Sequence, residues 1–209
     1  MLKKILEYCA NLWYSIFRIG ANLWYSIFRI GASGVKVMKK YSARDIANWF
    51  LWKNKVEQLE NENEYDDKYE VYEGLSHLKL QKLLYFAQGV SLAINNESLF
   101  SDKIYAWTHG PVVREVYDKF KKYGRNDIEL SINNKEMEVI ETLESDSKIS
   151  NVLNLVYDNF GIYTAWQLRE MTHIPSGPWE TTVRTKGMDK EISLNLIKDY
   201  FLNNVIEDA

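Results

Sequence analysis

The segment between Ser76 and Asn96 constrains the fold most, because its apolar residues recur with the period of an α-helix. These residues are Leu80, Leu83, Leu84, Ala87, Val90 and Ile94. Residues three or four positions apart share one face of a helix, so the segment predicts the central helix of the fold. Ser76 suits the N-cap position, and the asparagines at 95 and 96 end the helix. Its polar residues are turned away from the apolar face: Lys79, Lys82 and Gln88.

The same periodicity predicts further helices along the chain. Their expected ranges are 42–59, 111–123, 136–144, 149–160, one that starts at 164, and 193–205. Two capping boxes, Ser42 with Asp45 and Thr164 with Gln167, mark helix starts. Residues 103–107 are expected to form a short extended piece. The predicted fold is therefore mainly α, a single compact multi-helix domain with about seven helices and at most a short extended segment.

Gly110 and Pro111 predict the start of the helix expected at 111–123. Proline is tolerated at the first helical position, where its missing N–H group is not needed, and glycine commonly follows a helix end. We therefore expect a helix from Pro111 that carries an apolar face and stops at Gly124. That face consists of Val112, Val113, Val116, Tyr117 and Phe120.

The N-terminal part differs from the rest, because residues 11–21 and 22–32 both read NLWYSIFRIGA. A perfect repeat is typical of recent duplication, and we expect residues 1–37 to be an extension of a domain that spans 38–209. One interpretation is an appendage translated upstream of a true start at Met38. The other is an interfacial amphipathic helix, so membrane contact is expected only if residues 1–32 are genuine. Glu7, Arg18 and Arg29 argue against a spanning helix.

Charge divides the chain at the same place. Residues 1–37 have a net charge of +4, and the 21 basic and 28 acidic residues that follow have a net charge of −7. Nucleic-acid binding needs clustered Lys and Arg, so a nucleic acid is not an expected partner of the acidic body. Eight acids against the single Lys68 make residues 57–73 an acidic insertion, interpreted as a solvated loop or an acidic docking surface.

The sequence offers few groups for chemistry. Cys9 is the only cysteine, which excludes a disulfide framework or a cysteine zinc site and favours a reducing, cytoplasmic compartment. The three histidines lack metal-ligand spacing, and no phosphate-binding glycine loop or nucleophile elbow occurs. We therefore expect no metal, no cofactor and no catalytic residue. An enzyme that pairs His109 with His173 stays open as an alternative, against the interpretation that each histidine makes local hydrogen bonds.

Two turns combine tryptophan with glycine and proline: residues 107–112 (WTHGPV) and 172–179 (THIPSGPW). A tryptophan buries a large area with few rotors to freeze, so such turns pack rigidly against a core. The same residues can also act as anchors in a protein interface.

These residues resemble the Panacea antitoxin domain family, also described as SocA-like or phage-associated GepA-like. The resemblance rests on LKLQKLLYFAQG (78–89), AWTHGPVV (106–113) followed by VYDKFKKYG, and LREMTH (168–173) followed by Pro178 and Trp179. It covers residues 41–201, but the acidic insertion and residues 1–37 have no counterpart in the pattern.

The resemblance implies an antitoxin that binds a toxin encoded by an adjacent gene and blocks it, with no catalytic step. A proteolytic adaptor that delivers the toxin to a protease is the alternative. The toxin, the contact face and the oligomeric state stay open. The family motif implies a structural or partner-binding role for Lys79, Gln81, Lys82, Tyr85, Trp107, His109, Gly110, Pro111, Val112, Tyr117, Thr172, His173, Pro178 and Trp179. Further candidates for contact with the toxin are Trp49, Trp52 and Trp166.

Overall fold

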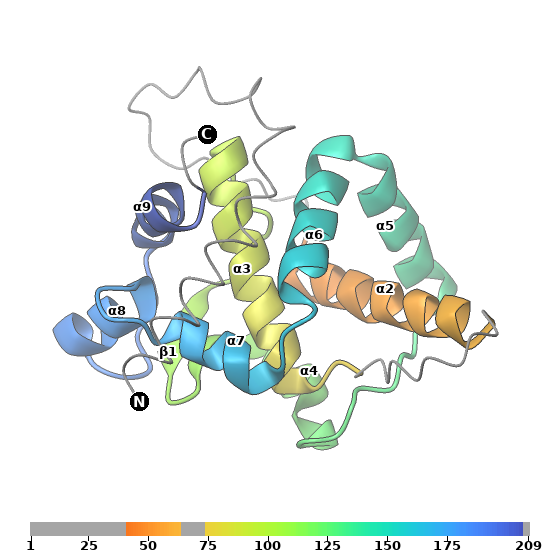
Figure 1. The fold of residues 1–209 in the computed structure, drawn as a ribbon, viewed down its shortest axis with the longest axis horizontal. Coiled ribbons are helices and arrows are strands. Elements are labelled where there is room, and N and C mark those ends of the chain that lie inside the picture. The colour runs from red at the N-terminus through yellow and green to blue at the C-terminus, as the bar shows by residue number, and fades with distance from the viewer. Residues whose placement is uncertain (1–40, 64–73, 207–209) are drawn as a thin grey trace.

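The computed structural model describes residues 41–63 and 74–206 (Figure 1). Within these ranges it contains eight α-helices, one 3-10 helix and one two-stranded hairpin, so the predicted mainly α fold class is confirmed. The helices are α2 (Ala43–Asn63), α3 (His77–Asn95), α4 (Arg114–Phe120), α5 (Asn134–Ser145), α6 (Ser147–Phe160), α7 (Ala165–Thr172), α8 (Pro178–Lys186) and α9 (Leu194–Asn204), with the 3-10 helix η2 (Lys121–Tyr123). The extension 1–37, Met38 and most of the acidic insertion lie outside the described residues.

Helix α3 occupies the centre of the fold, as its periodicity predicts. The side chain of Ser76 accepts a hydrogen bond from the backbone N–H of Lys79, and the left-handed residue Asn96 ends the helix. Helices α2, α4, α6, α7 and α9 and strand β2 (Gly110–Val113) all pack against α3. In Figure 1, α8 and α9 lie on one side of α3, and α2, α5 and α6 lie on the other. Because neighbours surround the helix, its polar residues Lys82 and Gln88 are buried together with its apolar face.

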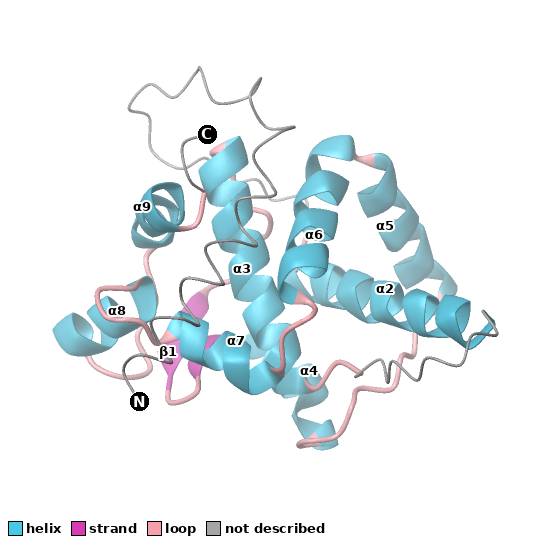
Figure 2. Cartoon of the chain, in the orientation of Figure 1, coloured by secondary structure: helices cyan, strands magenta, loops and turns pink. Residues whose placement is uncertain are grey.

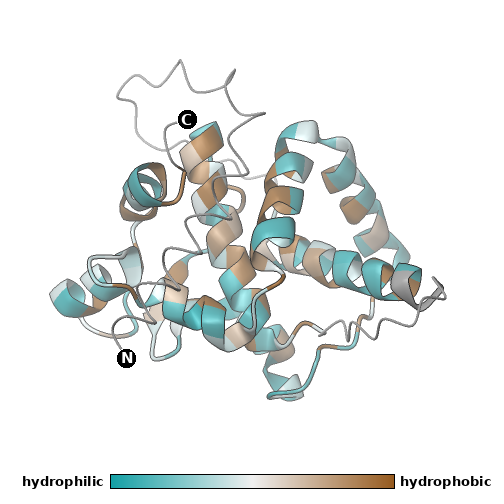
Figure 3. Cartoon of the chain, in the orientation of Figure 1, coloured by the Kyte–Doolittle hydropathy of each residue, from teal (hydrophilic) through white to brown (hydrophobic). Residues whose placement is uncertain are grey.

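Apolar side chains from all of these helices form one core. The Phe86 ring of α3 stacks on Phe160 of α6 with 4.2 Å between the ring centroids. On the opposite side of α3, the ring of Phe201 from α9 packs edge-to-face against Tyr85. Figure 3 shows the consequence in colour, because α3 is drawn mostly in brown and pale tones whereas the outer helices carry more teal.

Both predicted capping boxes are present. The Thr164 hydroxyl accepts a hydrogen bond from the backbone of Gln167, and the Gln167 side chain accepts one from the backbone of Thr164. Ser42 and Asp45 make the same reciprocal pair before α2. These local contacts depend only on residues three positions apart, which is why the sequence predicts them.

The prediction that a helix starts at Pro111 is wrong. Gly110–Val113 forms strand β2, paired antiparallel with β1 (Ile104–Trp107), and helix α4 begins only at Arg114 (Figure 2). The hairpin turn consists of Thr108 and His109, and Gly110 follows it with a φ of 100°. That φ is favourable only for glycine, so Gly110 serves the hairpin and not a helix start. The extended piece predicted at 103–107 is confirmed as β1.

Helix α8 is an element that the sequence analysis missed. Pro178 occupies its first turn and Glu180 is the acidic residue there, which are two ordinary signals of a helix start. After α8, residues 189–192 return to the hairpin, where the backbone N–H of Asp189 donates to the carbonyl of Ala106 over 2.8 Å. The hairpin is therefore held on its outer edge by the chain that leads into α9.

Gln88 fastens the loop after α3 to the helix. Its Oε1 accepts hydrogen bonds from the backbone N–H groups of Leu99 and Phe100, and its Nε2 donates to the carbonyl of Phe100. We expect Gln88→Leu to lower the free energy of unfolding by about 2 kcal/mol, because buried backbone groups lose their partners. Urea unfolding measures the loss. Asn151→Leu, at an exposed amide of α6, is the control and should change stability by less than about 0.5 kcal/mol.

Candidate functional site

Two polar side chains of α3 hold strand β2 from its inner side. Gln81 donates from Nε2 to the carbonyl of Val113 over 3.2 Å and accepts the Val113 N–H at 2.8 Å. From the next residue, Nζ of Lys82 donates to the carbonyl of Pro111 over 3.0 Å. These three bonds join α3 to the hairpin, so both motif residues have structural partners inside the fold.

Lys82 is the most unusual member of this group, because its whole side chain is buried. Burial lowers the pKa of the Lys82 ammonium to about 7, and the positive charge of Arg169 acts in the same direction. A buried ammonium without a carboxylate partner is costly, so the amine is close to losing its proton at neutral pH.

Gly110 is the point where three elements meet. A Cβ atom at this position would lie 2.7 Å from the Thr172 hydroxyl, 2.8 Å from Nζ of Lys82 and 3.1 Å from Cε1 of His173. The hairpin, α3 and the end of α7 can approach this closely only because position 110 has no side chain. The two sequence motifs around residues 110 and 172 therefore meet in one packed contact. We call it the joint; Lys82, Gly110, Thr172 and His173 form its centre.

His173 completes the joint from the C-terminal end of α7. Its Nδ1 lies 2.7 Å from the carbonyl of Arg169, and its Nε2 lies 3.4 Å from the carbonyl of Thr108. Desolvation lowers the pKa of His173, although its bond to the Arg169 carbonyl opposes that shift. Both carbonyls can only accept, and the Arg169 carbonyl is the nearer one, so in the neutral ring Nδ1 carries the hydrogen.

The indole of Trp179 closes the joint from α8. Its ring centroid lies 3.8 Å from that of His173, and its Nε1 donates to the carbonyl of Trp107 over 2.8 Å. Pro178, which starts α8, is buried beside it. The PW pair thus attaches α8 to the hairpin turn, as expected of a tryptophan in a rigid turn.

On its outer side the hairpin carries an aromatic and charged group. Trp107 packs edge-to-face on Tyr117 and donates from Nε1 to Asp189 over 2.7 Å. Arg114 donates to the same carboxylate and lies over the Tyr105 ring. The Arg114 hydrogen bond is the main reason why the pKa of Asp189 is lowered. Asp189 and Arg114 escaped the sequence analysis, since nothing local marks residues 75 positions apart as partners.

The remaining motif residues are also part of the packing. Lys79, Tyr85 and Val112 are buried, and burial raises the pKa of the Tyr85 hydroxyl, with Tyr200 adding to the effect. His109 is the exception, because it is exposed in the hairpin turn. Within the described chain, no hydrogen bond joins His109 to His173.

The three tryptophans considered as surface anchors differ from one another. Trp49 is fully buried and its Nε1 donates to Glu144, and Trp52 is half-buried against the core. Trp49, named above as a candidate for contact with the toxin, therefore offers no surface to a partner, because α5 covers that side of α2. Trp166 is 60% exposed, and Ile162, four residues earlier, is 72% exposed. These two are the most exposed large apolar side chains in the described ranges.

Two kinds of feature are absent from the described residues. In 41–63 and 74–206, no group of three or more His, Cys, Asp or Glu side chains is placed to hold a metal ion. No helix in the same ranges is long and apolar enough to cross a membrane.

Comparisons with known proteins agree on one family. The model of the SocA-like antitoxin Panacea domain matches residues 80–180, which include both motif turns. The antitoxin SocA of Caulobacter vibrioides (strain NA1000 / CB15N) is 31% identical over 135 residues, which cover 61% of this chain and 72% of that protein. No solved structure matches the chain.

Proposed function

Because the chain belongs to the SocA-like Panacea domain family of antitoxins, we propose that it neutralises a toxin by binding that toxin directly. The toxin is expected from an adjacent gene and meets this protein in the cytoplasm. Neutralisation occurs by covering a surface that the toxin needs, and it requires no catalytic step in this protein.

One observation carries the proposal: apart from the exposed His109, the motif residues have partners inside the fold. Gln81, Lys82 and Thr172 bond to backbone carbonyls or sit against Gly110, and His173 faces carbonyls with both ring nitrogens. A reactive site needs at least one such group free to meet a substrate. The motif is better explained as a rigid joint that presents the outer surfaces of the helices to a partner.

Helix α7 is the surface that this joint holds most directly; it carries the exposed Trp166, and the exposed Ile162 lies in the turn just before it. The guanidinium of Arg169 lies over the Trp166 ring at 4.6 Å, while Leu168 and Thr172 anchor the other side of α7 in the core. A tryptophan held in place before binding loses little freedom on contact, which is the property of an interface anchor. We therefore assign Ile162 and Trp166 to the toxin contact.

The test is co-expression of this chain with the product of the neighbouring gene. Direct neutralisation predicts that growth is rescued and that the two proteins co-purify at a constant ratio. Rescue without an isolable complex would contradict it. If the toxin instead disappears faster in cells that contain this protein and an active protease, adaptor action replaces neutralisation.

Replacing the anchor should weaken the complex while leaving the fold intact. We expect Trp166→Ala to raise the dissociation constant for the toxin at least about 30-fold, the effect typical of a central anchor. Met188→Ala, which removes another exposed apolar side chain, is the matched control and should change the constant less than about threefold. Titration calorimetry gives both values, and equal binding by the two variants would rule out the α7 surface.

A further inference from the structure

A hollow of about 230 Å³ lies between α2, the segment of α4 and η2, residues 129–131 and the start of α5. Its lining includes the apolar residues Leu51, Phe120 and Leu130. Its charged lining comes from α2, α4, η2, the following loop and α5: Arg44, Lys119, Lys122, Glu129 and Glu136. The hollow therefore combines an apolar part with charges.

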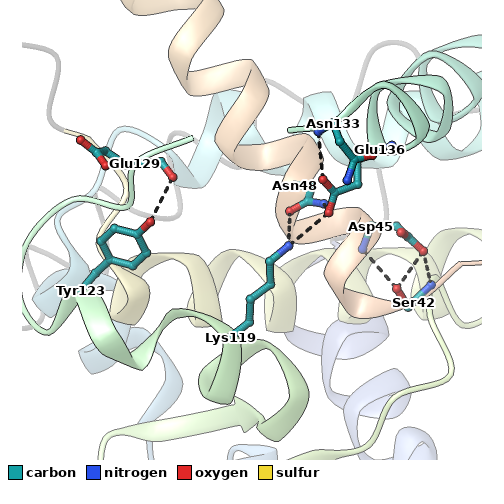
Figure 4. A network of polar contacts seen from close by, with 8 residues as sticks. All are labelled: Ser42, Asp45, Asn48, Lys119, Tyr123, Glu129, Asn133 and Glu136. Atoms are coloured by element: carbon teal, nitrogen blue, oxygen red, sulfur yellow. Dashed lines mark hydrogen bonds and ion pairs between the residues drawn. The ribbon is translucent and has the colours of Figure 1, made fainter. Parts of the chain in front are cut away.

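Two of these charges neutralise each other. Nζ of Lys119 lies 3.4 Å from Oε1 of Glu136, and the Asn48 side chain bonds to both (Figure 4). The backbone of Asn133 donates to the same carboxylate and is the main reason why the pKa of Glu136 is lowered. This group forms a fixed wall that has little capacity for another ligand.

The other two cations lack such partners. Neither Arg44 nor Lys122 has a carboxylate within salt-bridge distance in the described part of the chain, although Lys122 lies over the Tyr123 ring. Glu129 is the acid that remains on this rim. On a body whose net charge is negative, the hollow is a local site where an incoming carboxylate meets more positive than negative charge.

The chain beside the hollow also has free main-chain groups. Burial alternates along 128–133, with Glu129, Ser131 and Asn133 exposed and the residues between them turned inward, which is typical of an extended chain. Ile128 is paired through its N–H with the carbonyl of Leu75. From 129 to 132, the hydrogen bond from the Tyr123 hydroxyl to the Glu129 carbonyl is the one main-chain bond found among the described residues.

We propose that this hollow binds an extended, acidic segment of the toxin. Main-chain bonds to residues 129–132 align the segment, an apolar side chain enters beside Leu51 and Phe120, and carboxylates lie beside Arg44 and Lys122. Strand addition of this kind takes affinity from the backbone and specificity from side-chain pockets. The inference rests on the proposed function, because the toxin is the occupant.

The acidic body makes this contact selective. The net charge of residues 38–209 is −7, so a carboxylate-bearing segment is attracted only where cations gather, as at the hollow, and this contact orients the toxin. Charge contributes to this contact, whereas the Trp166 contact depends on apolar burial, so added salt should weaken the first more than the second.

The experiment measures binding of the co-purified neighbouring-gene product to the double variant Arg44→Glu/Lys122→Glu. We expect binding at least about tenfold weaker at low salt and a smaller difference at about 0.5 M salt, because screening removes the charge effect. Lys121→Glu is the matched control, since Lys121 is an exposed neighbour paired with Asp118 and does not line the hollow. It should bind within about twofold of the wild type.

A second pair of variants tests the main-chain contact. Ser131→Pro removes one backbone N–H and should weaken toxin binding, whereas Ser131→Ala keeps that N–H and should not. Circular dichroism and thermal unfolding verify that all variants fold, and Lys122→Glu alone replaces the double variant if that one does not.

The possible outcomes distinguish a failure of the hollow proposal from a failure of the proposed antitoxin function. If the wild type binds the toxin and the charge-reversed variant binds equally well, the hollow is not the contact. The same conclusion follows if Lys121→Glu weakens binding as much as the double variant, because the effect is then general charge. If the wild type fails to bind at all, the proposed function itself is wrong.

Discussion

Gly89→Ala should destabilise this protein by at least about 3 kcal/mol, even though alanine is the better helix former by about 1 kcal/mol. Gly89 lies in the middle of α3, where helix propensity alone favours a side chain. A Cβ at this position would overlap the ring carbons of Phe201 in α9. That ring is fully buried and packed against Tyr85 and Phe86, so it has no space to retreat. The expected loss therefore has the opposite sign from the one that propensity predicts.

Urea unfolding of the variant measures the loss, and a double-mutant cycle assigns its cause. Phe201→Leu shortens the side chain that the new methyl group meets, so Gly89→Ala should cost less in that background, with a coupling of about 1 kcal/mol or more. Asn151→Ala, on the exposed side of α6, is the control and should be neutral or slightly stabilising. A stabilised Gly89→Ala variant would show that α3 and α9 are not in close contact at this point.

The second large effect is the pH dependence that Lys82 produces. Its pKa is about 7 in the folded protein and 10.5 in an ordinary lysine. Between these two values the unfolded chain holds a proton that the folded chain has released, so raising the pH favours the folded state. The gain in unfolding free energy is therefore complete above pH 10.5 and is lost as the pH falls towards 7.

Lys82→Met removes this dependence. From about pH 7.5 to 9.5, the wild type should gain about 3 kcal/mol of unfolding free energy relative to the variant, at about 1.4 kcal/mol per pH unit. Urea titrations at several pH values provide the comparison, because all other titrating groups are shared. Lys190→Met, which removes an exposed lysine, should keep the slope of the wild type. Parallel pH profiles for Lys82→Met and the wild type would mean that the buried amine keeps its proton.

Local signals explain the parts of the fold that the sequence predicts well. The Ser76 cap, the Thr164 and Gln167 box and the apolar period of α3 all depend on residues within one turn of each other. Helix α8 was missed although Pro178 and Glu180 provide the same kind of signal, so that omission was avoidable. The helix expected from Pro111 failed for another reason, because the carbonyls of Pro111 and Val113 bond to side chains about 30 residues earlier in the chain.

The residues of the candidate site could be predicted from the sequence, but their contacts with one another could not. The motifs around residues 82, 110 and 173 were identified from the residue pattern, yet nothing in that pattern indicates that Lys82, Thr172 and His173 all approach Gly110. Trp49 and Trp166 look alike in the sequence, since both occur on helices. Burial of Trp49 by α5 and exposure of Trp166 depend on which helix faces are covered.

The motifs at 78–89, 106–113 and 168–173 were enough to indicate the family, and periodicity and caps, which act over three or four residues, were enough for the mainly helical class and most helix positions. Three-dimensional packing was needed to show that Gly89 and Gly110 are contact points, that Lys82 is buried, and which apolar side chains stay on the surface. Those properties arise when segments far apart in the chain exclude water from one another, and no local pattern records that event.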